Sequence, residues 1–341
     1  MAKESLAVKY RPKSFDDLTE QSAIKAILEN QIETKTFQHG YLFTGPAGTG
    51  KTTSARIFAN MINDGKGNPI EVDAASNSGV DNIRQIIEDA KRKPLDAEYK
   101  IFIVDECHSL SNGAWQALLK TLEEPPKFTI FIFCTTDPQK VPATILSRVQ
   151  RYNFQKISTD GIVERLGYII AQEIIHSEDI IYTEDAIDYI AKVSTGGMRD
   201  AITLLDKCLS LSRTLNLENV LKTIGAEDYS TFITFLSALT ENEKEISIKV
   251  IEDVYNAGKD VKQFMKDFAR FVLEVEKYAL YKNFNYISLP NNLENELEQL
   301  VGGALFDVMD FVVSLNNQIK WDNDPKTLIE LSILIYCGKE S

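Results

Sequence analysis

The sequence predicts an α/β domain followed by helical domains, an α/β plus all-α chain. Short apolar runs alternate with helical patterns in the first half, strand signals fade after residue 156, and the pattern from residue 216 onward is helical and acidic. Alternating strands and helices are typical of a parallel sheet with helices on both faces. We therefore expect three domains, at residues 1–156, 157–214 and 215–341.

The strands of the first domain are expected at short apolar runs rich in aromatic and β-branched residues. These runs are Tyr41–Phe43, Ile70–Val72, Ile101–Val104, Ile130–Phe133 and the weaker Tyr152–Phe154. They predict a five-stranded parallel sheet. Between the third and fourth runs, Gly113 to Glu124 reads as a helix, because its apolar residues recur at helical spacing and Pro125 and Pro126 end it.

The rest of the chain reads as helical. Residues 159–212 predict three short helices, with breaks near Ser177–Asp179 and at Gly196–Gly197. Farther on, spacers are expected at Gly258, residues 288–292 and Gly302–Gly303.

Composition limits the class of protein. The chain has 341 residues, 44% hydrophobic and 26% charged, so it can bury sizeable cores. No run approaches the roughly 20 apolar residues of a membrane span, and the N-terminal residues lack the apolar segment of a secretory signal. We expect a cytoplasmic protein without membrane contact. Four dispersed cysteines (Cys107, Cys134, Cys208, Cys337) predict reduced, structural thiols.

A phosphate-binding loop is predicted at residues 45–52, which read Gly-Pro-Ala-Gly-Thr-Gly-Lys-Thr between a strand and a helix. In such a loop the backbone N–H groups face phosphate oxygens beside a helix N-terminus. We expect Lys51 to reach the β- and γ-phosphates and Thr52 to coordinate Mg²⁺. The predicted nucleotide-binding residues of this loop are Gly45, Pro46, Ala47, Gly48, Thr49, Gly50, Lys51, Thr52 and Thr53. The alternative is a chance glycine-rich turn.

Two carboxylates follow the third strand run. A buried parallel strand delivers the residues at its C-terminal end to the ligand crevice. Asp105 is expected to help hold the Mg²⁺ water shell, and Glu106 to orient and polarise the attacking water. The alternative is an ordinary acidic loop. The fourth run ends in Thr135, Thr136 and Asp137, and we expect Thr135 to lie between Glu106 and the γ-phosphate.

Several further motifs resemble one family. Tyr10-Arg11-Pro12 with Phe15, Leu18 and Gln21 resembles the N-terminal segment of clamp-loader ATPases. Further segments that resemble this family occur throughout residues 7 to about 210. They are Asp105–Leu110, Ala117–Pro126, Thr135–Pro138, Pro142–Arg148 and Gly197–Ala201. Together they strongly resemble the gamma/tau subunit of the bacterial DNA polymerase III clamp loader. The resemblance implies an AAA+ P-loop domain, a small helical lid domain and a C-terminal helical collar domain.

This resemblance also implies roles for particular residues. Arg148 would act in trans, as an arginine finger on ATP held by a neighbouring subunit, because a guanidinium directs two donors at the transferring phosphoryl group. Arg199 would contact the γ-phosphate of its own subunit from the lid. Tyr10, Arg11 and Pro12 would lie near the adenine. For each arginine alone, a surface salt bridge is the alternative.

The sequence departs from the family at two places. The family's Ser-Arg-Cys reads Ser147-Arg148-Val149, which keeps the arginine. The family's four-cysteine zinc module is replaced by the short interval Asn63–Asn68, so we predict no zinc. This compact form leaves three interpretations open. The chain belongs to a phage, it belongs to a divergent bacterial lineage, or it reflects a similarity to archaeal and eukaryotic small clamp-loader subunits. The compartment is accordingly a bacterial or host cytoplasm.

As a clamp-loader ATPase, the chain would use ATP and Mg²⁺ and join other subunits in a ring or spiral, a pentamer. It would open a sliding clamp and bind primer–template DNA through phosphates, since a loader works at any sequence. Candidate DNA contacts are Arg84, Lys91, Arg92 and Lys93, although a solvated basic face is the alternative and the net charge of −13 argues against indiscriminate DNA binding. Clamp contacts are expected near residues 76–83 and 113–122.

Three other functions share some of these motifs. Another AAA+ DNA-remodelling motor would have the P-loop and both arginines, but is not expected to show the run Leu118–Pro126. A non-hydrolysing structural subunit of the loader would not need intact Lys51 and Glu106. A small-molecule kinase would need an acceptor pocket, which no motif indicates.

Overall fold

In a computed structural model, residues 4–176, 180–224, 229–290, 293–302 and 305–338 are described. The chain divides into two compact units, one of residues 1–180 and 190–210 and the other of residues 181–189 and 211–341. The expected division into three domains stays a prediction. No helix of the described residues is both long and apolar enough to cross a membrane.

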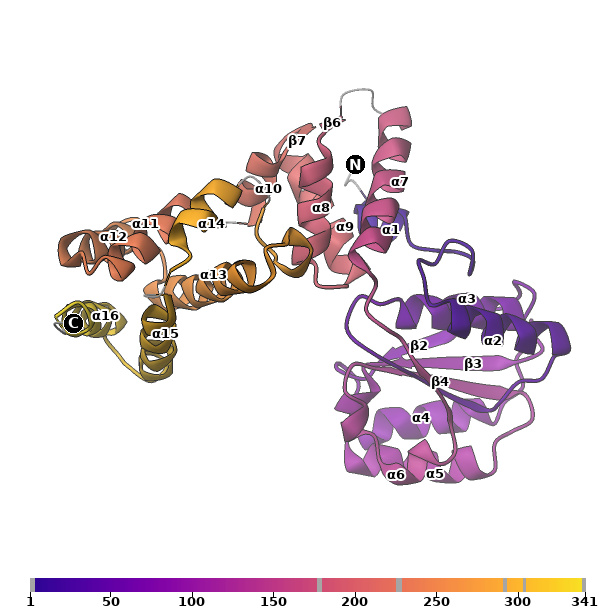
Figure 1. The fold of residues 1–341 in the computed structure, drawn as a ribbon. Helices are drawn as coiled ribbons and strands as arrows, with labels where there is room; N and C mark the ends of the chain where they lie inside the picture. The colour runs from indigo at the N-terminus through magenta and orange to yellow at the C-terminus, as the bar shows by residue number, and fades with distance from the viewer. Residues whose placement is uncertain (1–3, 177–179, 225–228, 291–292, 303–304, 339–341) are drawn as a thin grey trace. The chain divides into compact units, whose positions relative to one another are not determined.

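The first unit contains a parallel sheet of five strands in the order β2-β3-β4-β1-β5 (Figure 1). The strands are β1 Gly40–Thr44, β2 Ile70–Asp73, β3 Lys100–Asp105, β4 Thr129–Thr135 and β5 Gln150–Asn153. Each contains or overlaps one of the five expected runs, so the sheet prediction is confirmed. Because β4 lies between β1 and β3, the carboxyl ends of these three strands meet at one edge.

Helices cover both faces of this sheet, α2 and α3 on one face and α4 and α5 on the other (Figure 1). Alternate strand residues supply the two cores, since Tyr41 and Phe43 pack with the first pair of helices and Leu42 with the second. The helices and 3₁₀ turns of this part are α1 Leu6–Lys9, α2 Ser22–Thr34, α3 Lys51–Ile62, α4 Val80–Ala90, η1 Cys107–Ser109, α5 Asn112–Glu123, η2 Pro138–Lys140 and α6 Ala143–Leu146. Thus α5 lies where the sequence predicts it; Ser111 caps it by accepting from the N–H of Ala114.

Residues after the sheet form α7 Thr159–His176, α8 Glu184–Val193 and α9 Met198–Leu211, three helices as expected. The break at Gly196–Gly197 separates α8 from α9; the one expected at Ser177–Asp179 lies outside the described residues. A second, two-stranded parallel sheet joins β6 Ile181–Tyr182 to β7 Thr214–Leu215. We did not predict it, because two-residue strands are too short to show a period.

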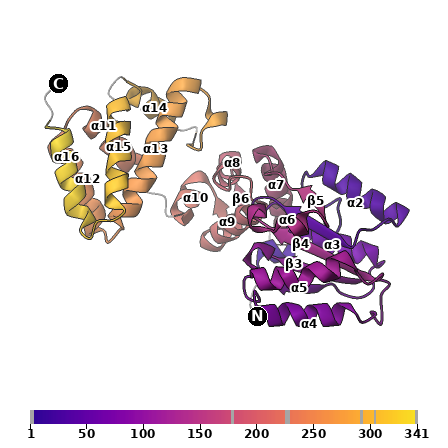
Figure 2. The same ribbon diagram turned by 90° about the horizontal axis from the view of Figure 1, so that it is seen from below.

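The second unit is otherwise helical and has its own aromatic core. Its elements are α10 Leu217–Ile224, α11 Tyr229–Thr240, α12 Lys244–Asn256, α13 Val261–Tyr281, η3 Phe284–Tyr286, α14 Glu294–Leu300, α15 Leu305–Ile319 and α16 Pro325–Tyr336. Phe235 of α11 packs on Phe268 of α13 with ring centroids 4.6 Å apart, and α13 packs along α15 (Figure 2). The expected spacer at Gly258 lies between α12 and α13, whereas residues 291–292 and Gly303 of the other two spacers lie outside the described residues.

Candidate functional site

The loop from β1 to α3 needs glycine where its backbone bends. Gly45 and Gly48 both have positive φ, 144° and 72°. A Cβ on Gly45 would lie 2.3 Å from the carbonyl oxygen of Phe154, and one on Gly48 would lie 3.0 Å from the Cα of Gly197. Helix α3 then begins without a side-chain cap, so the N–H groups of its first turn are left for a ligand.

Lys51 lies inside this loop. Its side chain is buried, and Nζ donates to the carbonyl oxygens of Gly45 and Pro46 at 2.9 and 2.7 Å. Burial lowers the pKa of Lys51, while the nearby Cys134, Glu106 and Asp105 raise it in part. The ammonium group is therefore held among loop carbonyls, close to two carboxylates.

Thr52 and Asp105 are joined across the site. The Thr52 hydroxyl donates to Oδ2 of Asp105 at 2.9 Å, and the N–H of Glu106 donates to Oδ1 of Asp105 at 3.0 Å. A hydroxyl beside a carboxylate at the end of a buried strand is a set of hard oxygen donors, which suits Mg²⁺. The residues present thus fit the predicted metal.

At the end of β4 the two threonines differ. Thr135 is fully buried, and its Oγ1 lies 3.0 Å from Nδ1 of His108 and accepts from the N–H of Asp137. Thr136 is exposed, and it is this residue whose hydroxyl donates to Oε2 of Glu106, at 3.3 Å. The structure therefore brings Thr136, not Thr135, to Glu106.

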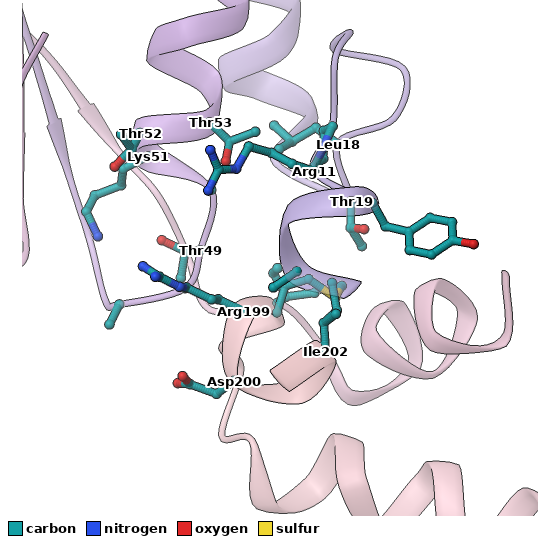
Figure 3. A pocket seen from close by; sticks show the side chains of 18 of the residues that line it. Arg11, Leu18, Thr19, Thr49, Lys51, Thr52, Thr53, Arg199, Asp200 and Ile202 are labelled. Atoms are coloured by element: carbon teal, nitrogen blue, oxygen red, sulfur yellow. The ribbon is translucent and has the colours of Figure 1, made fainter. Parts of the chain in front are cut away.

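Three arginines give the site a positive side. Burial, followed by the charges of Arg56 and Arg199, lowers the pKa of Arg11. Arg11 is thus close enough to feel the charges of both other arginines, of which Arg56 is paired with Glu71. Arg11 and Arg199 both point into the space beside the loop (Figure 3). Such a group of cations favours a polyphosphate ligand.

One cavity of about 510 Å³ is lined by Lys51, Thr52, Asp105, Glu106 and the three arginines, but not by Thr135, Thr136 or His108. Its lining comes from the N-terminal segment, the loop, the end of β3, α7 and the start of α9 (Figure 3). The predicted site residues that line it are Tyr10, Arg11, Pro12, Ala47, Gly48, Thr49, Gly50, Lys51, Thr52, Thr53, Asp105, Glu106 and Arg199. Gly45 and Pro46 are not in the lining, but their carbonyls hold Lys51.

The N-terminal segment is fixed against α7. The hydroxyl of Tyr10 donates to Oε1 of Glu173 at 2.7 Å, and Lys9 forms an ion pair with the same oxygen at 2.6 Å. Burial and the hydrogen bond to Glu173 raise the pKa of Tyr10. From α7, Arg165 also donates to the carbonyl oxygen of Tyr10. Tyr10, Arg11 and Pro12 are thereby held in the wall of the cavity.

The other predicted residues lie away from the cavity. Arg148 forms an ion pair with Glu123. Arg84 pairs with Asp81 and Lys91 with Glu88, whereas Arg92 and Lys93 are exposed after the end of α4. The described residues contain no cluster of three metal-ligating side chains, and all four cysteines are buried thiols outside any disulfide bond.

Sequence reasoning missed four residues of the site. Arg56 follows Thr52 by four positions on α3, so helical spacing was a signal for it. Thr136 could be identified only by knowing which of the two threonines at the end of β4 faces Glu106. His108 lies in the family-like segment Asp105–Leu110, but neither it nor Arg165 belongs to a spacing pattern that assigns it a role.

Parts of the chain match two family models. Residues 69–158 match "DNA polymerase III, delta subunit" and residues 162–214 match "DNA polymerase III clamp loader subunit, ATPase lid domain". Among solved structures, the RuvB Holliday junction branch migration motor of Thermotoga maritima aligns with a TM-score of 0.51 and 22% identity, over 68% of this chain and 80% of that one. This likeness shows the fold alone, the expected AAA+ fold.

Curated relatives cover most of this chain. The tau subunit of DNA polymerase III from Bacillus subtilis is 34% identical over 99% of this chain and 64% of its own length. The gamma/tau subunit of Mycoplasma genitalium is 34% identical over 82% of this chain, which spans only 50% of that relative. The gamma subunit of Buchnera aphidicola is 30% identical over 86% of both chains. The chain therefore belongs to the gamma/tau family of DNA polymerase III subunits.

Proposed function

We propose that this chain hydrolyses ATP as a motor subunit of a sliding-clamp loader. One observation carries the proposal: the fold gathers Lys51, Thr52, Asp105, Glu106 and Arg199 from three separate segments around one cavity. This set contains cations for phosphates, hard oxygen donors for Mg²⁺ and a carboxylate for water. Family membership supports the same function.

In this proposal the loop binds the phosphates. The N–H groups of residues 48–51 and the Lys51 ammonium neutralise the β- and γ-phosphates, and Arg199 approaches the γ-phosphate from α9. The ammonium now bonded to Gly45 and Pro46 exchanges these carbonyls for phosphate oxygens. Tyr10, Arg11 and Pro12, which line the same cavity, lie near the adenine.

Thr52 and Asp105 would hold Mg²⁺, directly and through water respectively. When bound, the ion offsets the negative charge that the leaving phosphate oxygens develop. Glu106 orients the attacking water and accepts its proton. Its Oε2 accepts a hydrogen bond from the Thr136 hydroxyl, whereas Thr135 is buried and forms no such bond with Glu106. We therefore place Thr136 beside Glu106 and keep Thr135 as its buried support.

Arg148 acts on the nucleotide of a neighbouring subunit. Its position outside its own cavity supports action in trans, because it cannot then serve the ATP of the same chain. ATP held by two subunits at once couples hydrolysis to the strength of their contact. The ATP-bound assembly, a ring or spiral pentamer, opens the clamp and receives primer–template DNA, and hydrolysis releases the closed clamp.

The three-domain division belongs to this proposal. Residues 1–156 bind ATP, residues 157–214 act as the lid, and residues 215–341 form the collar that joins subunits. The separate aromatic core of the second unit supports an independently packed collar. The match of residues 162–214 to the lid model supports the limits proposed for the middle domain.

The test is steady-state ATP hydrolysis by the assembled complex, with and without primer–template DNA and a candidate clamp. We expect DNA and clamp together to stimulate hydrolysis, and Lys51→Ala and Arg148→Ala to abolish the stimulated rate. Hydrolysis that ignores DNA and clamp, and survives Arg148→Ala, would show that the chain is another kind of ATPase.

A further inference from the structure

His108 lies beside the carboxylate that the proposed function assigns to the attacking water. It belongs to the 3₁₀ turn η1, directly after β3, and its Nδ1 is 3.2 Å from Oε2 of Glu106. The His108 side chain is 20% exposed and that of Glu106 is 40% exposed. The His108 side chain is therefore more buried than the Glu106 side chain that it contacts.

The backbone brings these two side chains together. Glu106 has φ 46° and ψ 42°, a left-handed conformation that residues other than glycine rarely adopt. This bend ends β3 and starts η1, so that a residue two positions later lies against the Glu106 carboxylate. Backbone strain of this kind persists where the surrounding structure holds it, often at functional sites.

The Nδ1 atom of His108 lies between two oxygen atoms. Nδ1 faces two oxygens, Oε2 of Glu106 and, at 3.0 Å, Oγ1 of Thr135. An ionised carboxylate only accepts, so Nδ1 must donate. Thr135 can accept from both Nδ1 and the N–H of Asp137, because a hydroxyl has two lone pairs. A ring that carries a proton on Nδ1 can therefore donate toward Glu106 while buried Thr135 supports it from the other side.

The two oxygens of Glu106 consequently have different surroundings. Oε2 is contacted by His108 and by the hydroxyl of Thr136. Within the described part of the chain, Oε1 makes no hydrogen bond, and the residue lines the cavity. One oxygen is anchored, and the other is left to accept a bond from water.

We infer that His108 is a positioning residue for hydrolysis, which holds Oε2 so that Oε1 faces the attacking water. The inference rests on the proposed function. Its support is the chain of contacts from buried Thr135, through His108, to Glu106. His108 does not touch the nucleotide in this scheme, so it affects the chemical step and not nucleotide affinity.

The experiment compares His108→Leu with His108→Asn in the complex. Leucine removes the donor, whereas the asparagine amide nitrogen can occupy the place of Nδ1. We expect His108→Leu to lower kcat by about 10- to 100-fold, as misplacement of a catalytic group does, with an unchanged Kd for a non-hydrolysable ATP analogue. His108→Asn should recover most of the rate. His39→Asn, at a residue that does not line the cavity, is the control and should match the parent.

Thr136→Val supplies a second measurement. It avoids the risk that a substitution at half-buried His108 disturbs folding. Thr136 is exposed, and its loss should lower kcat less than His108→Leu but in the same direction. The inference is wrong if His108→Leu keeps the parent rate, or if asparagine is no better than leucine. Failure of the proposed function looks different, because Glu106→Gln would then still hydrolyse ATP at the parent rate.

Discussion

Arg148 donates from Nη2 to Oε1 of Glu123 at 2.6 Å, which joins a residue two positions before β5 to the last residue of α5. Its Nη1 donates to the carbonyl oxygen of Thr144 and to the hydroxyl of Ser147. The guanidinium is thus held in one orientation, outside the cavity of its own chain. A preset orientation costs little entropy when the group meets a neighbour's phosphate.

We expect Arg148→Ala to lower the hydrolysis rate of the complex by about a thousandfold or more, the usual contribution of an arginine finger, while nucleotide still binds. Arg151→Ala, an exposed arginine on β5, is the matched control. Where two copies of this chain are neighbours, mixing Arg148→Ala with Lys51→Ala subunits should restore activity, since some interfaces then combine an intact loop with an intact arginine. An Arg148→Ala complex with full activity contradicts action in trans.

Asp105→Asn should raise the Mg²⁺ concentration needed for half-maximal hydrolysis by about 10- to 100-fold, because it removes the charge that supports the Mg²⁺ water shell. A Mg²⁺ titration of the rate measures this shift. Asp73→Asn is a close control, since Asp73 pairs with Asp105 in register on the neighbouring strand and does not line the cavity. An equal shift in both variants would argue for a general loss of structure.

For DNA, we expect Arg92→Ala combined with Lys93→Ala to weaken binding more than Arg84→Ala combined with Lys91→Ala. Arg84 and Lys91 are already paired with acidic neighbours on α4. Each lost phosphate contact lowers the slope of log affinity against log salt by about 0.9 on duplex DNA. Lys222→Ala, an exposed lysine paired with Glu218, is the control. An unchanged slope in both double variants would leave these residues as a solvated face.

The cysteines should resist alkylation in the folded protein. Burial raises the pKa of Cys107 and of Cys134, so both stay protonated at neutral pH, and the thiolate is the reactive form. Mass spectrometry after iodoacetamide treatment should find no modified cysteine until denaturant is added. Rapid labelling of Cys134 in native buffer would contradict the buried position.

The sheet was predictable from the sequence because its central strands are buried on both faces. Ile101–Val104 and Ile130–Phe133 are continuous apolar runs, which parallel strands between two helical layers require. The loop at 45–52 was equally predictable, since its glycines lie where the backbone needs a positive φ. Strands β6 and β7 were not predictable, because each has two residues and depends on a partner more than 30 residues away.

The details of the site depend on geometry that no sequence spacing records. Side chains alternate along a strand, so choosing between Thr135 and Thr136 required the register of β4 at its last residue. His108 reaches Glu106 only because the backbone between them bends into the left-handed region. The pair of Arg148 and Glu123 joins residues 25 positions apart. These contacts arise from folding of the chain and not from local patterns.

The phosphate loop and the start of α9 are joined without any side chain. The N–H of Met198 donates to the carbonyl oxygen of Gly48 at 3.0 Å, at the point where Gly197 approaches Gly48 most closely. Main-chain atoms cannot change rotamer to absorb a displacement, so a shift of the loop either carries α9 with it or breaks this bond. This main-chain bond therefore couples the position of α9 to that of the loop, and a side chain at Gly48 would push the two segments apart.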